Sequence, residues 1–312
     1  MALVQIVIFV LLGSAITASS ICAQGDANGA ILEQKKYSFP QFEKLSIKNP
    51  PFTKLEYDAA KSGEFQTERI AYLSDGLKVA AYLYRPKERN GRLPIIVFNR
   101  GGYTRGNIAP ELVVIFHRLA QHGFAVVAPL YRGSDGGEGK DEVGGDDLAD
   151  LMNVVPLIKS FDFADGQNIF LYGESRGGMM VFQAIRDKFP ANAAATYGAF
   201  SNFSDLVAAN ERQYLPLLHM IWADYDSRKA EVAQRRSVIS WVKNISIPVL
   251  LMHGGADRSV NPMQTLRLAQ LLEEQGKPYE LLIYEGDNHS IIRNQSDRDE
   301  RAAAWFMKHL KK

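Results

Sequence analysis

The 312-residue chain is long enough for one large α/β domain or two small ones. It is 46% hydrophobic and 23% charged, its formal net charge is +1, and no block of Lys and Arg stands out, which argues against a nucleic-acid-binding protein. The six histidines are scattered without HExxH spacing and the sequence has no CxxC pair, so we expect no metal and no cofactor.

The first 23 residues differ in composition from the rest. Residues 2–16 are almost wholly apolar, and small and polar residues follow up to Ala23, which predicts a signal peptide (1–23) and export to the periplasm or the extracellular space. No Lys or Arg precedes the apolar run and Ile21 is large for its place, so an uncleaved membrane anchor and lipid attachment at Cys22 stay open. Cys22 is the only cysteine, so the mature chain would carry neither a disulfide nor a cysteine nucleophile.

Residues 24–65 are polar and weakly patterned, with a break at residues 49–51. We interpret them as an N-terminal extension that lies on the main domain, residues 66–312. At the start of that domain, residues 69–73 and 79–85 alternate between apolar and polar side chains around the turn sequence Ser74-Asp75-Gly76. This pattern predicts a β-hairpin.

Strand and helix patterns alternate through the rest of the chain. Short apolar runs predict strands at residues 94–98, 124–129, 168–172, 193–197, 248–253 and 279–284. Helical spacing predicts helices at residues 110–122, 146–159, 177–189, 262–275 and 298–310. This order predicts an α/β fold with a mostly parallel central sheet and helices on both faces.

Residues 200–244 interrupt the alternation. The segment is helical in pattern, rich in aromatic and charged residues, and too long for a simple connection between two strands. We therefore expect a small helical cap inserted over the carboxyl edge of the sheet. Tyr214, Trp222 and Tyr225 could line a substrate pocket there, although aromatic residues at helical spacing more often pack in a core.

The segment Gly173-Glu174-Ser175-Arg176-Gly177-Gly178 joins a predicted strand to a predicted helix. In this context a G-x-S-x-G sequence forms a sharp turn that exposes the serine, with glycines leaving room for the strand and the helix to approach. The serine lies at a helix N-terminus, where developing negative charge is favoured. We therefore predict that Ser175 is a catalytic nucleophile.

A serine hydroxyl needs a base, and the two later strands supply the partners. Asp257 follows the strand at 248–253, and His289 follows the strand at 279–284, which gives the chain order Ser, Asp, His of α/β hydrolases. His289 would take and return the serine proton, and Asp257 would orient the imidazole. His253 is the nearest rival base, but its place at a strand end favours a role in bracing the Asp257 loop, and Asp287 is the rival acid.

An oxyanion hole needs two hydrogen-bond donors. The backbone N–H of Arg176 is the first candidate, because it follows the nucleophile. The second is expected in the loop after the strand at 94–98, where Arg100, Gly101 and Gly102 let a backbone amide approach a substrate oxygen.

These motifs resemble the catalytic domain of the prolyl oligopeptidase (S9) family of serine peptidases. The resemblance rests on the segments around Ser175 and from His253 to Asp257, on Tyr131-Arg132-Gly133-Ser134, and on residues 276–282, and it extends from about Glu68 to the C-terminus. It implies an α/β-hydrolase fold, acyl-enzyme chemistry without a metal, and peptides or related acyl compounds as substrates.

The sequence departs from the family in two places. No β-propeller precedes the domain, and Arg100 occupies the position where peptidase members often have a tyrosine that donates to the oxyanion. Arg100 would then donate through its guanidinium or its backbone, or Tyr103 would replace it.

Three functions remain open from the sequence. The first is an exported serine peptidase acting on short peptides, and the second is a carboxylesterase or acyl hydrolase on the same scaffold. The third is a non-catalytic binding protein, which would be expected to show a damaged triad. The expected binding partner is thus a small peptide or ester substrate. No motif indicates the oligomeric state.

Overall fold

The computed structural model describes residues 27–47, 50–103 and 106–311. The predicted signal peptide, residues 1–23, lies outside the described residues. Within the described ranges, the structure has no helix of the length and apolar character that crossing a membrane requires.

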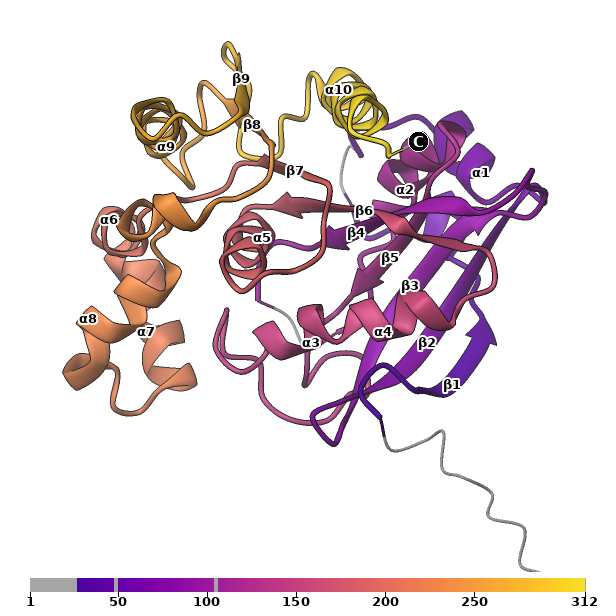
Figure 1. The fold of residues 1–312 in the computed structure, drawn as a ribbon, viewed down its shortest axis with the longest axis horizontal. Helices are drawn as coiled ribbons and strands as arrows, with labels where there is room; N and C mark the ends of the chain where they lie inside the picture. The colour runs from indigo at the N-terminus through magenta and orange to yellow at the C-terminus, as the bar shows by residue number, and fades with distance from the viewer. Residues whose placement is uncertain (1–26, 48–49, 104–105, 312) are drawn as a thin grey trace, which may run out of the picture.

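A single nine-stranded sheet forms the centre of the described structure, with the strand order β1-β2-β3-β5-β4-β6-β7-β8-β9 (Figure 1). The strands are β1 (Ile31–Lys36), β2 (Phe65–Ser74), β3 (Leu77–Pro86), β4 (Leu93–Asn99), β5 (Ala125–Pro129), β6 (Ala164–Glu174), β7 (Ala193–Tyr197), β8 (Val249–Gly254) and β9 (Tyr279–Tyr284). Strands β1, β2, β3 and β5 pair antiparallel in turn, whereas β5, β4 and β6 to β9 pair parallel. The predicted hairpin and the mostly parallel sheet are confirmed.

Helices cover both faces of this sheet. Helices α1 (Lys54–Ala60), α2 (Leu112–Gln121) and α10 (Gln295–Lys308) lie on one face, and α3 (Leu148–Met152), α4 (Val154–Ser160), α5 (Arg176–Arg186) and α9 (Met263–Glu274) lie on the other (Figure 1). In β4, Ile95 and Val97 belong to one hydrophobic core and Ile96 and Phe98 to the other. Because both faces are buried, the strand sequence is continuously apolar.

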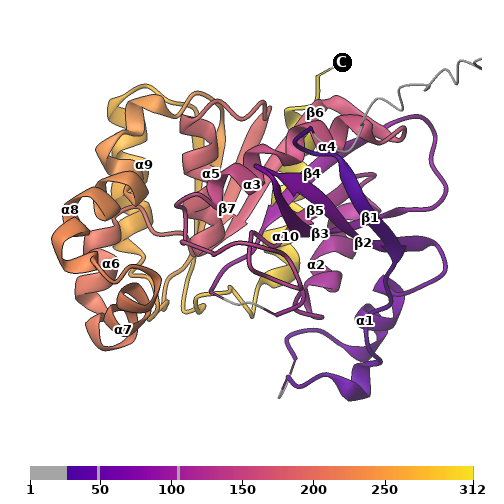
Figure 2. The ribbon, with the colours of Figure 1, turned by 90° about the horizontal axis from the view of Figure 1, so that it is seen from below.

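The inserted segment is helical, as predicted, and it contacts both the helices beside the sheet and the loops at the carboxyl edge. It forms α6 (Phe203–Ala209), α7 (Glu211–Ile221), α8 (Tyr225–Arg236) and two short 3₁₀ turns. These elements pack against α5 and α9, beside the sheet, and Asn210 reaches the carboxyl edge by donating to the Ser259 carbonyl (Figure 2). Trp222 and Tyr225 are buried and stack on each other, so they pack in a core rather than line a pocket.

Two other predictions are corrected by the structure. Residues 24–65 do not simply lie on the domain, because β1 extends its sheet and α1 covers one of its faces. The single helix expected at residues 146–159 is divided into α3 and α4 at Asn153. Pro156 lacks an N–H for the carbonyl four residues earlier, and its ring crowds that carbonyl, so a continuous helix is disfavoured.

Candidate active site

Ser175 lies on a strained turn between β6 and α5. Its backbone has φ 51° and ψ −117°, a conformation that L-residues rarely adopt. The elbow is also tightly packed, because a Cβ atom at Gly177 would overlap the carbonyl oxygen of Asn99 at the end of β4. Such strain persists only where surrounding structure holds it, and it fixes the serine at the carboxyl edge of the sheet.

His289 and Asp257 meet at the same edge. The Nδ1 atom of His289 lies 2.7 Å from Oδ2 of Asp257, whose side chain is fully buried. An ionised carboxylate can only accept, so Nδ1 carries the proton and Nε2 is left as the basic nitrogen. Within the described ranges no direct hydrogen bond joins Ser175 to His289, which is common in unliganded sites where this contact tightens with substrate.

His253 holds the Asp257 carboxylate from the opposite side. Its Nε2 lies 2.9 Å from Oδ2 of Asp257 and 3.0 Å from the Val260 carbonyl, and its Nδ1 lies 2.7 Å from the hydroxyl of Thr265. Since both neighbours of Nε2 are acceptors, this nitrogen is a donor. His253 therefore braces the Asp257 loop, which is the arrangement that the sequence analysis favoured over its use as a base.

Asp257 is stabilised in its charged form. Burial works to raise its pKa, but hydrogen bonds from His253 and His289 outweigh burial, and the pKa lies below the ordinary value for an aspartate. Two backbone amides, from Ser259 and Val260, also donate to Oδ1. The carboxylate is thus held ionised and fixed in orientation.

Asp287, the rival acid, organises the loop that carries His289. Its carboxylate accepts from the backbone amides of Asn288, Arg293 and Asn294 and from the Asn294 side chain, at 2.9 to 3.2 Å. These bonds commit both oxygens to the loop itself. The structure therefore brings Asp257, and not Asp287, to the His289 ring.

The guanidinium of Arg100 points into the protein rather than toward the nucleophile. It donates to the carbonyls of Leu130 at 2.8 Å and of Gly101 and Gly102 at 3.3 Å, and it is almost completely buried. This finding contradicts the alternative in which the guanidinium would donate to an oxyanion. The Tyr103 hydroxyl is buried and has no hydrogen-bond partner among the residues that the structure describes, so it also does not face an open cleft.

A cluster of charged side chains anchors the loop after β4, residues 100–103, against α5; this loop contains Gly101 and Gly102 and is called the glycine loop below. The Arg176 guanidinium pairs with Asp141 at 2.6 Å and Asp147 at 2.8 Å, and it donates to the Gly102 carbonyl at 3.1 Å. Arg176 and Arg100 both lie over the ring of Tyr131. Sequence analysis singled out Tyr131 only as part of a motif, and the structure shows that it is the platform for two arginines.

Two backbone amides remain available near Ser175. A Cβ atom at Gly101 would lie 3.3 Å from Cβ of Ser175, so the glycine loop passes directly beside the nucleophile. In the part of the chain that the structure describes, the N–H groups of Gly101 and Arg176 have no protein acceptor. The geometry thus favours backbone donors for an oxyanion hole.

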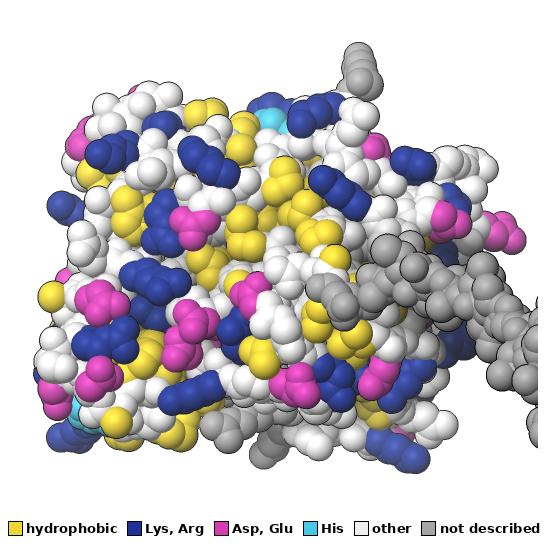
Figure 3. All heavy atoms as spheres, turned by 60° about the horizontal axis from the view of Figure 1, so that its bottom comes forward, with side chains coloured by type: hydrophobic (Ala, Val, Ile, Leu, Met, Phe, Trp, Pro, Cys, Tyr) yellow, Lys and Arg dark blue, Asp and Glu magenta, His cyan; other side chains and the backbone are white. Residues whose placement is uncertain are grey.

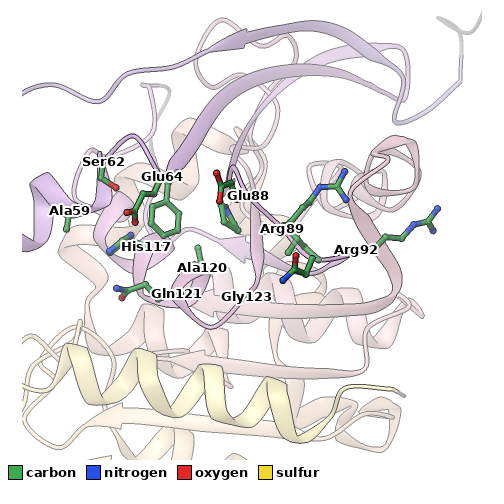
Figure 4. Close-up of a pocket in the computed structure, with 14 residues that line it drawn as sticks. Ala59, Ser62, Glu64, Glu88, Arg89, Arg92, His117, Ala120, Gln121 and Gly123 are labelled. Atoms are coloured by element: carbon green, nitrogen blue, oxygen red, sulfur yellow. The ribbon is translucent and has the colours of Figure 1, made fainter.

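A cavity of about 460 Å³ opens beside this site and is bordered by Gly101, Glu174 and Ser290. A second cavity of about 780 Å³ lies at the opposite end of the sheet, where β4 begins, and contains His117 (Figure 4). His117 is held by the hydroxyl of Tyr84 at 3.1 Å, and burial lowers its pKa. Of these two cavities, the one beside Ser175 is placed to receive a substrate.

The described residues contain no group of three or more His, Cys, Asp or Glu side chains placed to hold a metal. On the face shown in Figure 3, Lys and Arg side chains are interspersed with Asp and Glu rather than gathered in a stripe. That face therefore offers no continuous basic track for a nucleic acid.

Comparison with known proteins identifies the family. Residues 112–312 match the model of the prolyl oligopeptidase family. The uncharacterized peptidase YtmA of Bacillus subtilis is 31% identical over 77% of this chain and 92% of its own length. Dipeptidyl-peptidase 5 of Porphyromonas gingivalis is 26% identical over 72% of this chain, which spans only 34% of that relative.

A solved structure supports the fold. Acylaminoacyl peptidase of Pyrococcus horikoshii superposes with a TM-score of 0.67 at 22% sequence identity, covering 84% of this chain and 44% of that one. The chain thus corresponds to nearly all of YtmA and to less than half of the two larger proteins. With its α/β-hydrolase fold and a family match over more than half of its length, this chain is a serine hydrolase that belongs to the prolyl oligopeptidase family of serine peptidases.

Proposed function

We propose that the protein cleaves short peptides by acyl transfer to Ser175. His289 Nε2 would accept the hydroxyl proton as the serine oxygen attacks the substrate carbonyl, and would then return the proton to the leaving amine. Water would hydrolyse the acyl-enzyme by the same route. The observation that carries this proposal is the 2.7 Å contact between His289 Nδ1 and a buried Asp257, at the sheet edge where Ser175 is exposed on its strained turn.

Transition-state charge would be stabilised by the amides of Arg176 and Gly101. Gly101 lies beside Ser175 and Arg176 follows it in the chain, and preorganised donors of this kind commonly supply the largest share of catalysis. Peptides are favoured over simple esters as substrates because the two relatives compared above by sequence are named peptidases.

A labelling experiment tests the mechanism. A fluorophosphonate should modify Ser175, as located by mass spectrometry, and Ser175→Ala should lower kcat/KM for a peptide p-nitroanilide by at least about 10⁴-fold. The mutant should keep the wild-type melting temperature within about 2 °C, because the change is small and lies at a cleft surface. Near-full activity in Ser175→Ala would refute the mechanism, and a strong preference for p-nitrophenyl acetate over the anilide would favour the esterase alternative.

We further propose that the protein is exported after cleavage behind Ala23, on the basis of its apolar N-terminal sequence. The expected mature N-terminus is Gln24, which mass spectrometry of the protein from the extracytoplasmic fraction would reveal. An intact N-terminus in the membrane fraction would instead support an uncleaved anchor.

A further inference from the structure

The cavity beside the nucleophile has a mixed lining. Ile47, Phe52, Leu112 and Ile292 contribute apolar surface, and Glu174 and Glu111 contribute carboxylates, of which Glu174 is the one next to Ser175. The volume of about 460 Å³ lies in the range of pockets that hold small ligands. Its lining residues come from the N-terminal segment, α2 and the loop after His289, so the cavity exists only in the folded chain.

Glu174 is the last residue of β6 and directly precedes Ser175. Gly101 lies against both side chains, because a Cβ atom there would be 3.3 Å from Cγ of Glu174 and 3.3 Å from Cβ of Ser175. A substrate carbonyl attacked by Ser175 would therefore place a neighbouring group of the same molecule within the cavity that Glu174 lines.

The Glu174 carboxylate interacts with two hydroxyl groups, those of Ser290 and Tyr197, and with no cation in the part of the chain that the structure describes. The Ser290 hydroxyl donates to its Oε1 at 3.2 Å. Among residues that the structure describes, no Lys, Arg or His forms an ion pair with Glu174. A half-buried carboxylate without a cation is an unfavourable arrangement that a positively charged ligand would relieve.

The two arginines that border the cavity are committed elsewhere. Arg298 pairs with Asp299 at 2.8 Å and donates to the Ser290 carbonyl at 2.6 Å. Arg100 lies 3.5 Å from Asp141 and donates to the Leu130 carbonyl. Both guanidinium groups are thus held by an acidic side chain and a backbone carbonyl, and neither forms an ion pair with Glu174.

We propose that this cavity is a substrate subsite that binds a cationic group through Glu174, with the apolar wall contacting the aliphatic part that carries the cation. This inference rests on the proposed function, since it assigns the specificity of the same site. The chemistry is that of an alkylammonium, which a peptide provides either at its free N-terminus or on a lysine side chain next to the scissile bond.

Four p-nitroanilides separate the two sources of charge. Ala-Ala is compared with acetyl-Ala-Ala for the N-terminal ammonium, and acetyl-Ala-Lys with acetyl-Ala-norleucine for the side chain, at about pH 7, where both ammonium groups are charged. In the wild type, kcat/KM for at least one cationic substrate should exceed its neutral match by about 10-fold or more. The pair that shows the preference identifies the source.

Glu174→Gln should abolish that preference, lowering the cationic-to-neutral ratio about 10- to 100-fold, because the amide keeps the shape and removes the charge. Glu285→Gln is the matched control, since Glu285 is exposed on the His289 loop and does not line the cavity; it should leave the ratio unchanged. Added salt should lower the cationic-to-neutral ratio of kcat/KM in the wild type, and it should leave the ratio of Glu174→Gln unchanged.

The outcomes are distinguishable. A wild type that hydrolyses the neutral substrates through Ser175 but shows no preference for either cation, or a preference that survives in Glu174→Gln, overturns the subsite and leaves the peptidase mechanism standing. Hydrolysis of none of the four substrates, together with no fluorophosphonate labelling, overturns the proposed function itself.

Discussion

The two aspartates near His289, Asp257 and Asp287, have different structural roles. Asp257 contacts the imidazole, whereas Asp287 ties the loop that carries it. We expect Asp257→Asn to lower kcat about 10³- to 10⁴-fold, because the amide disturbs the tautomer and orientation of the ring. Asp287→Asn should cost no more than about 10-fold, because one side-chain oxygen still accepts from the loop. Steady-state kinetics on both variants checks this order, and a larger loss at position 287 would transfer the role of the acid.

The Asp257 carboxylate should also make the stability of the fold depend on pH. Its folded pKa lies below the value of about 3.9 expected in the unfolded chain, so the ionised form stabilises the fold above that pH. This contribution, on the order of 2 kcal/mol, is lost as the pH falls from about 4 through the folded pKa. Urea unfolding of wild type and Asp257→Asn should show a stability gap at neutral pH that narrows in acid. A gap that is constant with pH would contradict the assignment.

Among the secondary elements, α5 is joined to the glycine loop by one ion-pair cluster. Asp141→Asn would leave the buried Arg176 guanidinium with Asp147 alone, and we expect it to lower the free energy of unfolding by about 2–4 kcal/mol. The Gly102 carbonyl would lose part of its anchor, so kcat should fall about 10- to 100-fold with KM changed less than about 3-fold.

Asp146→Asn is the matched control for that experiment. Asp146 lies in the same segment, is exposed, and forms no ion pair in the described structure. Its substitution should change neither stability nor kcat. Equal losses of stability and kcat in the two variants would mean that the net charge of this segment, rather than the contact of Asp141 with Arg176, positions the glycine loop.

Local sequence patterns predicted the elements whose faces are buried. β4 was evident as an apolar run, and Ser175, Asp257 and His289 were evident because each follows such a strand. β1 was missed because all six of its side chains are exposed, so no apolar alternation marks it. The direction of the Arg100 side chain was undetermined, since its partners Leu130 and Asp141 are distant in sequence. The cavity beside Glu174 was hidden for the same reason, because Phe52 and Ile292 meet only through tertiary packing.

At the scale of the whole molecule, β1 protects an edge of the sheet. It pairs with residues 68–72 of β2, yet buries none of its own side chains. A chain that begins at Tyr37 should keep kcat/KM within about 3-fold, because four strands separate β1 from β6, which Ser175 follows, but it should self-associate through the exposed β2 edge. Size-exclusion chromatography with light scattering would show this, with a chain that begins at Ala27 as the control. A monomeric but inactive product would mean that β1 shapes the site.

The catalytic residues appear in a fixed order as the chain is synthesised. The wall residues near Phe52 and the glycine loop at Gly101 come first, Ser175 and Asp257 follow, and His289 comes from the last loop before α10. A nascent chain therefore contains a nucleophile long before it contains a base. Hydrolytic activity of ribosome-bound chains would begin only after the loop that carries His289 has been synthesised, so the order of these residues along the chain delays activity until the other walls of the site are present.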